Sequence, residues 1–307
     1  MNAVVRSACA LLLVVLTLPL HAEVLVVTLL GTGAPAPQTE RFGPAVLVEA
    51  GHQKLLFDAG RGVAQQVYEL RQPFAEINKV FITHLHYDHV IGLPDLLMSG
   101  WVFQRDEPLE VWGPAGIGEH LGNLVSAYQA DIQSRLAYTE LSPQGIRYKA
   151  QLLSQGVVYE REGVKVTAFQ VDHGDFKPAW GYRVDYEERS VVISGDTRYS
   201  KNLIKHARGV DLLIHEVAAA SKALREHNPR LGKVLAYHTS PEALAKVLTE
   251  TSPRFAVLTH LVVFGVPDDE LLEAVKRGHK TEVLIGRDLM AFDVGEVIRP
   301  YSRAQRR

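Results

Sequence analysis

The stretch Lys79-Val80-Phe81-Ile82-Thr83-His84-Leu85-His86-Tyr87-Asp88-His89 decides the fold of this chain. It opens with an apolar run typical of a buried strand and then presents four side chains that can bind metal: His84, His86, Asp88 and His89. Imidazole nitrogen and carboxylate oxygen are ligands suited to zinc, and both bind in their deprotonated forms. In a tight loop this spacing lets His84 and His86 bind one ion while Asp88 and His89 turn toward a second. The alternative, a polar loop with surface histidines, requires four potential ligands to cluster by chance.

Three later residues complete a candidate set of seven ligands. His173, Asp196 and His260 each follow an apolar run that predicts a strand. Side chains placed just after strands can converge on one edge of a sheet, whereas any one of these residues taken alone is more often a turn residue. We therefore predict a first metal site of His84, His86 and His173, a second site of Asp88, His89 and His260, and Asp196 as the bridge between them.

Short runs rich in Val, Leu and Ile alternate with helical patterns along the whole chain, which favours sheets with helices packed outside. The predicted strands are Glu23–Leu30, Ala45–Glu49, Lys54–Phe57, Lys79–Ile82, Leu109–Trp112, Val164–Val171, Trp180–Asp185, Ser190–Ile193, Asp211–Ile214, Arg254–Leu258, Thr281–Ile285 and Leu289–Val294. The predicted helices are Gly62–Leu70, Leu93–Phe103, Ile117–Tyr128, Glu242–Glu250 and Asp268–Arg277. Ser240 and Pro241 mark the start of the fourth helix.

Four motifs carry a wider resemblance: Thr28–Gly33, Leu56–Gly60, the His84 motif continuing to Pro94, and Ser194–Thr197. Together they resemble the metallo-β-lactamase superfamily, and within it the ribonuclease Z and arylsulfatase-like branch, over residues 24–295. The resemblance implies an α/β fold, a four-layer αββα sandwich with the metals at one sheet edge. It also implies two Zn²⁺ ions per chain, for which Mn²⁺ or Fe²⁺ could substitute. Asp58 would be a structural residue near the metal loop, although a plain turn aspartate fits equally well.

The candidate catalytic residues are Asp88, which is also counted among the ligands, His238 and Glu216. His215-Glu216 and His238-Thr239-Ser240 resemble the paired motifs of ribonuclease Z, in which a Glu orients a His beside the scissile phosphate. The resemblance implies that His238 stabilises the charged transition state or protonates the leaving oxygen, and that Glu216 holds its ring. Two alternatives stay open: His238 as an exposed residue at a helix start, and Glu216 as a buried or capping carboxylate.

Residues 1–22 predict a secretory signal peptide, because Arg6 lies near the start, Ala8–Leu18 is apolar, and Leu20-His21-Ala22 offers a small residue for cleavage. We therefore expect a periplasmic or secreted protein without a membrane anchor after cleavage. Cys9 is the only cysteine, so the mature chain would lack the cysteine ligand of the best-known class B β-lactamases. The expected layout is a signal peptide at 1–22, one hydrolase domain at 23–300 and a polar tail at 301–307.

We predict the substrate from two features: the number of residues between His173 and Asp196, and the net charge of the chain. Only 22 residues separate His173 from Asp196, which leaves no room there for the long Gly- and Pro-rich arm that grips transfer RNA in ribonuclease Z. The net charge of −2 also lacks the basic excess of a nucleic-acid binder, although a local basic patch is compatible with it. We therefore expect an exported dinuclear zinc hydrolase of small anionic esters, either phosphodiesters or aryl sulfates. Nucleic acid is not an expected partner, and a homodimer is left open.

Three alternatives use the same residues. The first is a lactone or thioester hydrolase, since the metal site also suits a tetrahedral intermediate. The second is a ribonuclease Z-type endonuclease that lacks the transfer RNA arm, and export argues against it. The third is a non-catalytic protein that holds an anionic ligand on its metals, and the complete ligand set argues against that.

Overall fold

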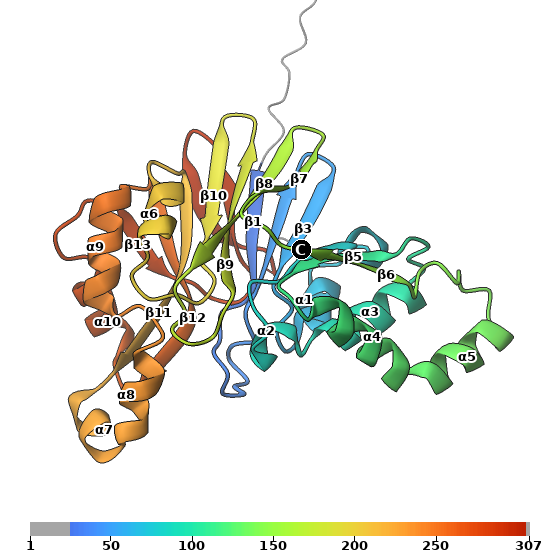
Figure 1. Cartoon of the computed structure of the whole chain (residues 1–307). Helices are drawn as coiled ribbons and strands as arrows, with labels where there is room; N and C mark the ends of the chain where they lie inside the picture. Colours follow the sequence, from blue (N-terminus) through green and yellow to red (C-terminus); the bar gives the residue numbers. More distant parts are fainter. Residues whose placement is uncertain (1–24, 305–307) are drawn as a thin grey trace, which may run out of the picture.

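The computed structural model describes residues 25–304 (Figure 1). The predicted signal peptide at residues 1–22 lies outside the described residues, as do residues 305–307 of the predicted tail. Within residues 25–304, no helix combines the length and the apolar character that crossing a membrane requires.

Two sheets form the body of the molecule (Figure 1). The first sheet has eight strands in the spatial order β15 (Ile298–Ser302), β14 (Met290–Val294), β1 (Leu25–Gly31), β2 (Ala45–Ala50), β3 (Gln53–Phe57), β4 (Lys79–Phe81), β5 (Leu109–Gly113) and β6 (Tyr148–Leu152). The second has seven in the order β13 (Glu282–Ile285), β12 (Phe255–Phe264), β11 (Leu212–Ala220), β10 (Arg189–Ile193), β9 (Ala179–Tyr186), β8 (Val164–Val171) and β7 (Gly156–Arg161). The last two strands of the chain thus return to the sheet built by its first half.

Helices cover the outer faces of the two sheets. Those that accompany the first sheet are α1 (Val63–Glu69), a 3-10 turn (Phe74–Glu76), α2 (Tyr87–Val90), α3 (Leu93–Val102), α4 (Ile117–Ala127) and α5 (Gln129–Tyr138). Those that accompany the second are α6 (Lys201–Ala207), α7 (Lys222–His227), α8 (Pro229–Leu235), α9 (Pro241–Thr251) and α10 (Asp268–Val275). Buried side chains of α1, α3 and α4 pack on the first sheet, and those of α6, α9 and α10 pack on the second. The predicted four-layer αββα sandwich is confirmed.

Aromatic rings fill the space between the sheets next to the strand that leads into the His84 loop. Phe81, at the end of β4, stacks on Phe57 at 5.0 Å and on Trp112 at 4.6 Å between ring centroids. It also meets Tyr182 of the second sheet edge-on at 5.8 Å, and the Tyr182 hydroxyl donates a hydrogen bond to the carbonyl of Ile82 at 2.7 Å. Burial of these rings stabilises the sandwich and fixes the end of β4 against the opposite sheet. The loop after β4 therefore begins at the junction of the two sheets.

The structure departs from the predicted elements in three respects. β11 and β12 continue to Ala220 and Phe264, beyond the predicted ends at Ile214 and Leu258. β15 runs through Ser302 and pairs with β14, so the first residues of the predicted tail belong to a strand. β6, β7, α5, α7 and α8 were not predicted, because they bury few residues and their sequences carry no clear apolar alternation. α6 was not predicted either, although it buries Leu203, Ile204 and Ala207.

Candidate metal centre

Asp58, the residue after β3, fixes the loop that follows β4. One of its carboxylate oxygens accepts the backbone N–H of Thr83 at 2.8 Å, and the other accepts the Thr83 hydroxyl at 2.9 Å. The second oxygen also lies 2.7 Å from His89 Nδ1. Asp58 has a φ of 59°, a left-handed backbone conformation in which aspartate is enriched. Because the Nδ1–H of His89 donates to Asp58, Nε2 is the atom of that ring that faces the other donors.

His173, Asp196 and His260 come from the second sheet. His173 lies in the loop between β8 and β9, and Asp196 lies in the loop after β10, beside Gly195 with its φ of 60°. His260 does not follow a strand as predicted, because β12 continues past it. It is the extra residue of a β-bulge opposite the register shift after Glu216 of β11, and its φ is 43°. Such a bulge turns a side chain out of the regular alternation, and here it turns His260 toward the other donors.

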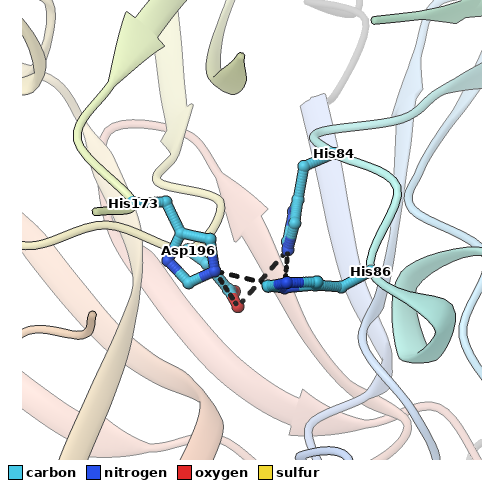
Figure 2. A group of neighbouring side chains, drawn as sticks. All are labelled: His84, His86, His173 and Asp196. Carbon is cyan, nitrogen blue, oxygen red and sulfur yellow. Dashed lines mark hydrogen bonds and ion pairs between the residues drawn. The ribbon is translucent and has the colours of Figure 1, made fainter. Parts of the chain in front are cut away.

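Four donor atoms converge in a first group, as Figure 2 shows. His86 Nδ1 lies 2.9 Å from His84 Nε2 and 3.2 Å from His173 Nε2. Asp196 Oδ2 lies 3.7 Å from His84 Nε2 and 3.8 Å from His173 Nε2. The three histidines predicted for the first site are therefore brought together with the predicted bridge.

Hydrogen bonds behind two of these rings select the nitrogen that faces the group. Thr83 Oγ1 lies 2.9 Å from His84 Nδ1, and the backbone carbonyl of Tyr237 lies 2.9 Å from His173 Nδ1. A histidine whose Nδ1 is engaged in this way presents Nε2 to a metal, and the partner also fixes the orientation of the ring. The loop that contains Tyr237, which is not itself a donor, thus fixes the orientation of the His173 ring.

Asp88, His89 and His260 form the second group. His260 Nε2 lies 3.2 Å from both His89 Nε2 and Asp88 Oδ2, and the last two atoms are 3.7 Å apart. Asp196 reaches this group through its other oxygen, since Oδ1 lies 3.4 Å from His89 Nε2 and 3.6 Å from His260 Nε2. Asp196 therefore offers one oxygen to each group, which is the placement that a bridging carboxylate needs.

The donor set fits a dinuclear metal site. Within each group the donor atoms all lie within 4.8 Å of one another. A tetrahedral ion with nitrogen ligands at about 2.0 Å holds them roughly 3.3 Å apart, and the separations here scatter on both sides of that value. Asp196 Oδ1 is buried and has no hydrogen-bond partner among the described residues. Its nearest partners are His89 Nε2 at 3.4 Å and His260 Nε2 at 3.6 Å, and a cation bound among these atoms would stabilise a buried carboxylate oxygen that makes no hydrogen bond.

The protonation states of the histidines differ between the two groups. Burial, together with nearby His89, holds the pKa of His84 well below its usual value, and burial lowers the pKa of His86 and of His173. Burial also lowers the pKa of His89, but Asp196 and Asp58 outweigh it and raise that pKa well above the usual value. The first group is thus held in its metal-binding form, whereas His89 carries a proton that a metal ion must displace.

His238 and Glu216 form a pair beside the shared carboxylate. Glu216 is buried in β11, and its Oε1 accepts the backbone N–H groups of Thr239 at 2.8 Å and Thr197 at 3.3 Å. Its Oε2 lies 3.4 Å from His238 Nδ1, which lies 4.0 Å from Asp196 Oδ2. Burial lowers the pKa of His238, but Glu216 and then Asp196 outweigh it and raise that pKa to about 9. The pair therefore places a cationic histidine next to both donor groups.

Phe176 is a residue of the site that the sequence analysis missed. The centroid of its ring lies 3.9 Å from that of His86 and 5.5 Å from that of His84. It stands three residues after His173, in the short loop that leads to β9. Its place in that loop is the only signal that the sequence offered, because an aromatic residue alone predicts a core position more often than a site.

Known proteins are similar to this chain over most of its length. A family described as "Beta-lactamase superfamily domain" matches residues 53–261. The ribonuclease Z of Mycolicibacterium gilvum (strain PYR-GCK) is 34% identical over 274 residues, which cover 87% of this chain and 96% of that protein. The ribonuclease Z of Mycobacterium avium (strain 104) is 36% identical over 241 residues, covering 77% and 85%.

Solved structures show the same similarity. Human tRNase Z, short form, superposes with a TM-score of 0.65 at 25% identity, covering 88% of this chain and 99% of that chain. A metallo-beta-lactamase fold protein from Bacillus subtilis, YhfI, superposes with a TM-score of 0.67 at 19% identity, with the same two coverages, and this likeness supports the fold.

The relatives named ribonuclease Z contradict the predicted function, an exported hydrolase of small phosphodiesters or aryl sulfates, and the predicted exclusion of nucleic acid as a partner. The interval between His173 and Asp196 is short, since β9 and β10 fill it, but this excludes only one place for an element that grips RNA. Net charge averages over the whole surface and does not exclude a local basic region. By its sequence and its fold, the chain belongs to the metallo-β-lactamase superfamily and is a metal-dependent hydrolase related to ribonuclease Z.

Proposed function

We propose that this chain is a metal-dependent endoribonuclease, an enzyme that cleaves phosphodiester bonds within RNA. The observation that carries the proposal is the contact of 3.4 Å between Glu216 Oε2 and His238 Nδ1, made beside the two donor groups in a chain with ribonuclease Z relatives. A cationic histidine at that place suits a reaction in which negative charge grows on a phosphate. Transfer RNA is the first class of RNA to test, because human tRNase Z is a structural relative.

The metal ligands remain those of the two groups. We assign one ion to His84, His86 and His173 and the other to Asp88, His89 and His260, with Asp196 between them, and we propose zinc for both because the donors are nitrogen and carboxylate oxygen. When bound, such ions lower the pKa of water toward neutrality and neutralise charge on phosphoryl oxygens. Asp88 contributes to catalysis only through the ion that it binds.

His238 acts on the substrate through its second ring nitrogen. Its Nδ1 faces Glu216, which leaves Nε2 to donate a hydrogen bond to a phosphate oxygen or a proton to the leaving oxygen of the ribose. Glu216 cannot rotate freely, because Thr239 and Thr197 hold its other oxygen. Glu216 is thus a positioning residue that keeps His238 charged and correctly oriented.

The proposal is tested with purified, metal-replete protein and a set of RNAs that contains a transfer RNA precursor and an unstructured RNA of equal length. We expect cleavage that stops on chelation, and a fall in kcat of about 10²–10⁴-fold in His238→Ala with two metal ions per chain still bound. His52→Ala is the matched control, because His52 lies in the exposed turn between β2 and β3, at the end of β3 away from Asp58. Failure of the wild type to cut any of these RNAs, or an undiminished rate in His238→Ala, would refute the proposal.

Where the enzyme acts stays a prediction. The predicted export to the periplasm or the medium rests on residues 1–22, which lie outside the described residues. An exported endoribonuclease would meet RNA outside the cytoplasm. Fractionation of cells that express the full chain, followed by immunodetection and measurement of its mass, tests the prediction directly.

A further inference from the structure

The α7–α8 hairpin, residues 222–235, projects from the body of the molecule. Neither helix has a buried residue, and Figure 1 shows the hairpin at the lower left, at the same end of the sheets as α2. It is a defined element all the same, because the Ser221 side chain caps α7 and the Asn228 side chain caps α8. A short, capped helical hairpin with no buried side chain contributes little to the core, so its sequence is free to serve another purpose.

The hairpin is basic although the chain as a whole is slightly acidic. It carries four cationic side chains against the single carboxylate of Glu226, while the whole chain has a net charge of −2. Lys222 lies 3.9 Å from Glu226. Arg225, Arg230 and Lys233 are exposed and have no carboxylate partner among the described residues. Three unpaired cations within nine residues give a local positive potential that attracts polyanions.

A second projecting element gives a useful contrast. Helices α4 and α5 also extend from the body, on the opposite side of Figure 1, and α5 buries only Ile132. Its single arginine, Arg135, is paired with Asp131 at 2.8 Å, and Glu119 on α4 adds a negative charge. A projecting, exposed helix pair in this protein is therefore not basic by default. The excess of unpaired cations distinguishes the α7–α8 hairpin from α4 and α5.

The end of the hairpin is continuous with the metal centre. Leu235, the last residue of α8, packs on a small apolar cluster that includes Ala218 of β11. Two residues later, the backbone carbonyl of Tyr237 accepts the hydrogen bond from His173 Nδ1 at 2.9 Å, and the next residue is His238. A hairpin held at this point cannot shift without moving the support of a metal donor and the histidine that faces Glu216.

We propose that the α7–α8 hairpin binds the phosphate backbone of the RNA substrate and sets its position relative to His238. The inference rests on the proposed endoribonuclease function. Arg225, Arg230 and Lys233 would each neutralise a phosphate and release a counterion, a contribution to affinity that depends on salt and not on sequence. The hairpin would thereby bind RNA as the long arm of ribonuclease Z does, an arm for which the His173–Asp196 interval of this chain has no room.

The test is RNA binding by a variant with Arg225→Gln, Arg230→Gln and Lys233→Gln, made in the His238→Ala background so that the RNA stays intact. Fluorescence anisotropy with a labelled transfer RNA precursor measures Kd between 50 and 300 mM salt. Relative to His238→Ala alone, we expect Kd at about 0.15 M salt to rise at least tenfold and the slope of log Kd against log salt to fall by roughly 2 to 3. Circular dichroism and metal content should match the parent, which shows that the hairpin change leaves the fold intact.

The matched control removes three cations elsewhere: Lys276→Gln, Arg277→Gln and Lys280→Gln. These residues precede β13, which is parallel to β12, so they lie at the amino ends of these strands, opposite to the edge that carries His260. The control should leave Kd and its salt slope at the parental values. An equal loss in both variants, or no loss in the hairpin variant, overturns the inference. Cleavage of RNA by the wild type together with unchanged binding in the hairpin variant overturns the inference alone and leaves the proposed function standing.

Discussion

At the scale of single residues, Asp196 is the point on which the centre depends. Its two oxygens face different donor groups, and burial raises its pKa while His260, His89 and His84 outweigh that effect and hold the pKa well below the usual range. The carboxylate is therefore ionised before any metal arrives. The neighbouring histidines thus keep the Asp196 carboxylate in the charged form that binds a cation. The same histidines, which we assign as ligands, offset the cost of burying that charge.

Glu216→Gln should lower the pKa of His238 in the metal-free protein. Glu216 is the main influence that raises this pKa to about 9 against the effect of burial, so its loss should bring the imidazole midpoint well below 9, as followed by NMR. Because the folded pKa lies above the unfolded value near 6.5, the pair stabilises the metal-free fold fully below pH 6.5, and this contribution is lost as pH rises through about 9. A midpoint unchanged in Glu216→Gln would show that another group sets the pKa.

The division of the candidate donors into two groups could be predicted from the sequence. The backbone conformations that bring the donors together could not. His84, His86 and Asp88 lie on one short loop, where spacing alone limits which side chains can meet. His260 reaches the site through a bulge and a left-handed φ, and neither is visible in a run of apolar residues. Phe176 was missed for a similar reason, since its contact with His86 depends on how a loop folds back.

At the scale of elements, the contribution of a helix cap to stability can be measured at the start of α9. Ser240 Oγ accepts the backbone N–H of Ala243 at 3.2 Å, and Pro241 occupies the first turn, as the sequence predicted. α9 buries six residues, including Leu244 and Leu248, so its cap should contribute to global stability. Ser240→Ala is expected to lower the free energy of unfolding by about 1 kcal/mol in urea titration.

Ser221→Ala is the matched comparison for that prediction. Ser221 caps α7 in the same way, with its side chain accepting the N–H of Leu224, but α7 has no buried residue. Its loss should loosen the hairpin locally, detected as faster amide hydrogen exchange in residues 222–227, with little change in global stability. Equal global losses in the two variants would contradict this view of the hairpin.

The elements that sequence patterns predicted best are those buried on at least one face. β1, β2, β8 and β10 match their predicted ranges within two residues at the ends that the structure describes, because burial imposes an apolar run that can be recognised. β6 and α7 are exposed along almost all their length, so no apolar pattern was required of them. The hairpin that we propose to bind RNA was thus among the elements that hydrophobic periodicity does not predict.

At the scale of the whole molecule, metal should stabilise the fold, because the donors come from both sheets. Removal of the ions by chelation and dialysis is expected to lower the midpoint of thermal unfolding by roughly 10 °C, since binding at concentrations far above Kd is worth about 4 kcal/mol. A His86→Ala/His260→Ala variant, which loses a donor from each group, should show little further change with chelator. An unaltered midpoint in verified metal-free wild type would count against the assigned ligands.

The substrate prediction failed at this same scale. It relied on the short interval before Asp196, on the expected export and on the net charge of −2, and it gave too little weight to the local basic patch with which that charge is compatible. The fold and the grouping of the candidate donors followed from local sequence patterns. In our proposal, the preference for RNA over a small ester depends on exposed residues such as Arg225 and Arg230, whose local charge the net charge of the chain does not reveal.

The separation of the donors along the chain also determines when during its synthesis the protein can first act. His84 to His89 leave the ribosome early, but the first donor group is complete only after Asp196 has been made, and the second only after His260. At translation rates of 5–20 residues per second, the growing chain spends roughly 10 to 30 s with its first donors made and its last one missing. During that time it lies close to messenger and ribosomal RNA without a complete centre. If the chain is the endoribonuclease that we propose, the growing chain cannot cleave that RNA while its last ligand is still missing.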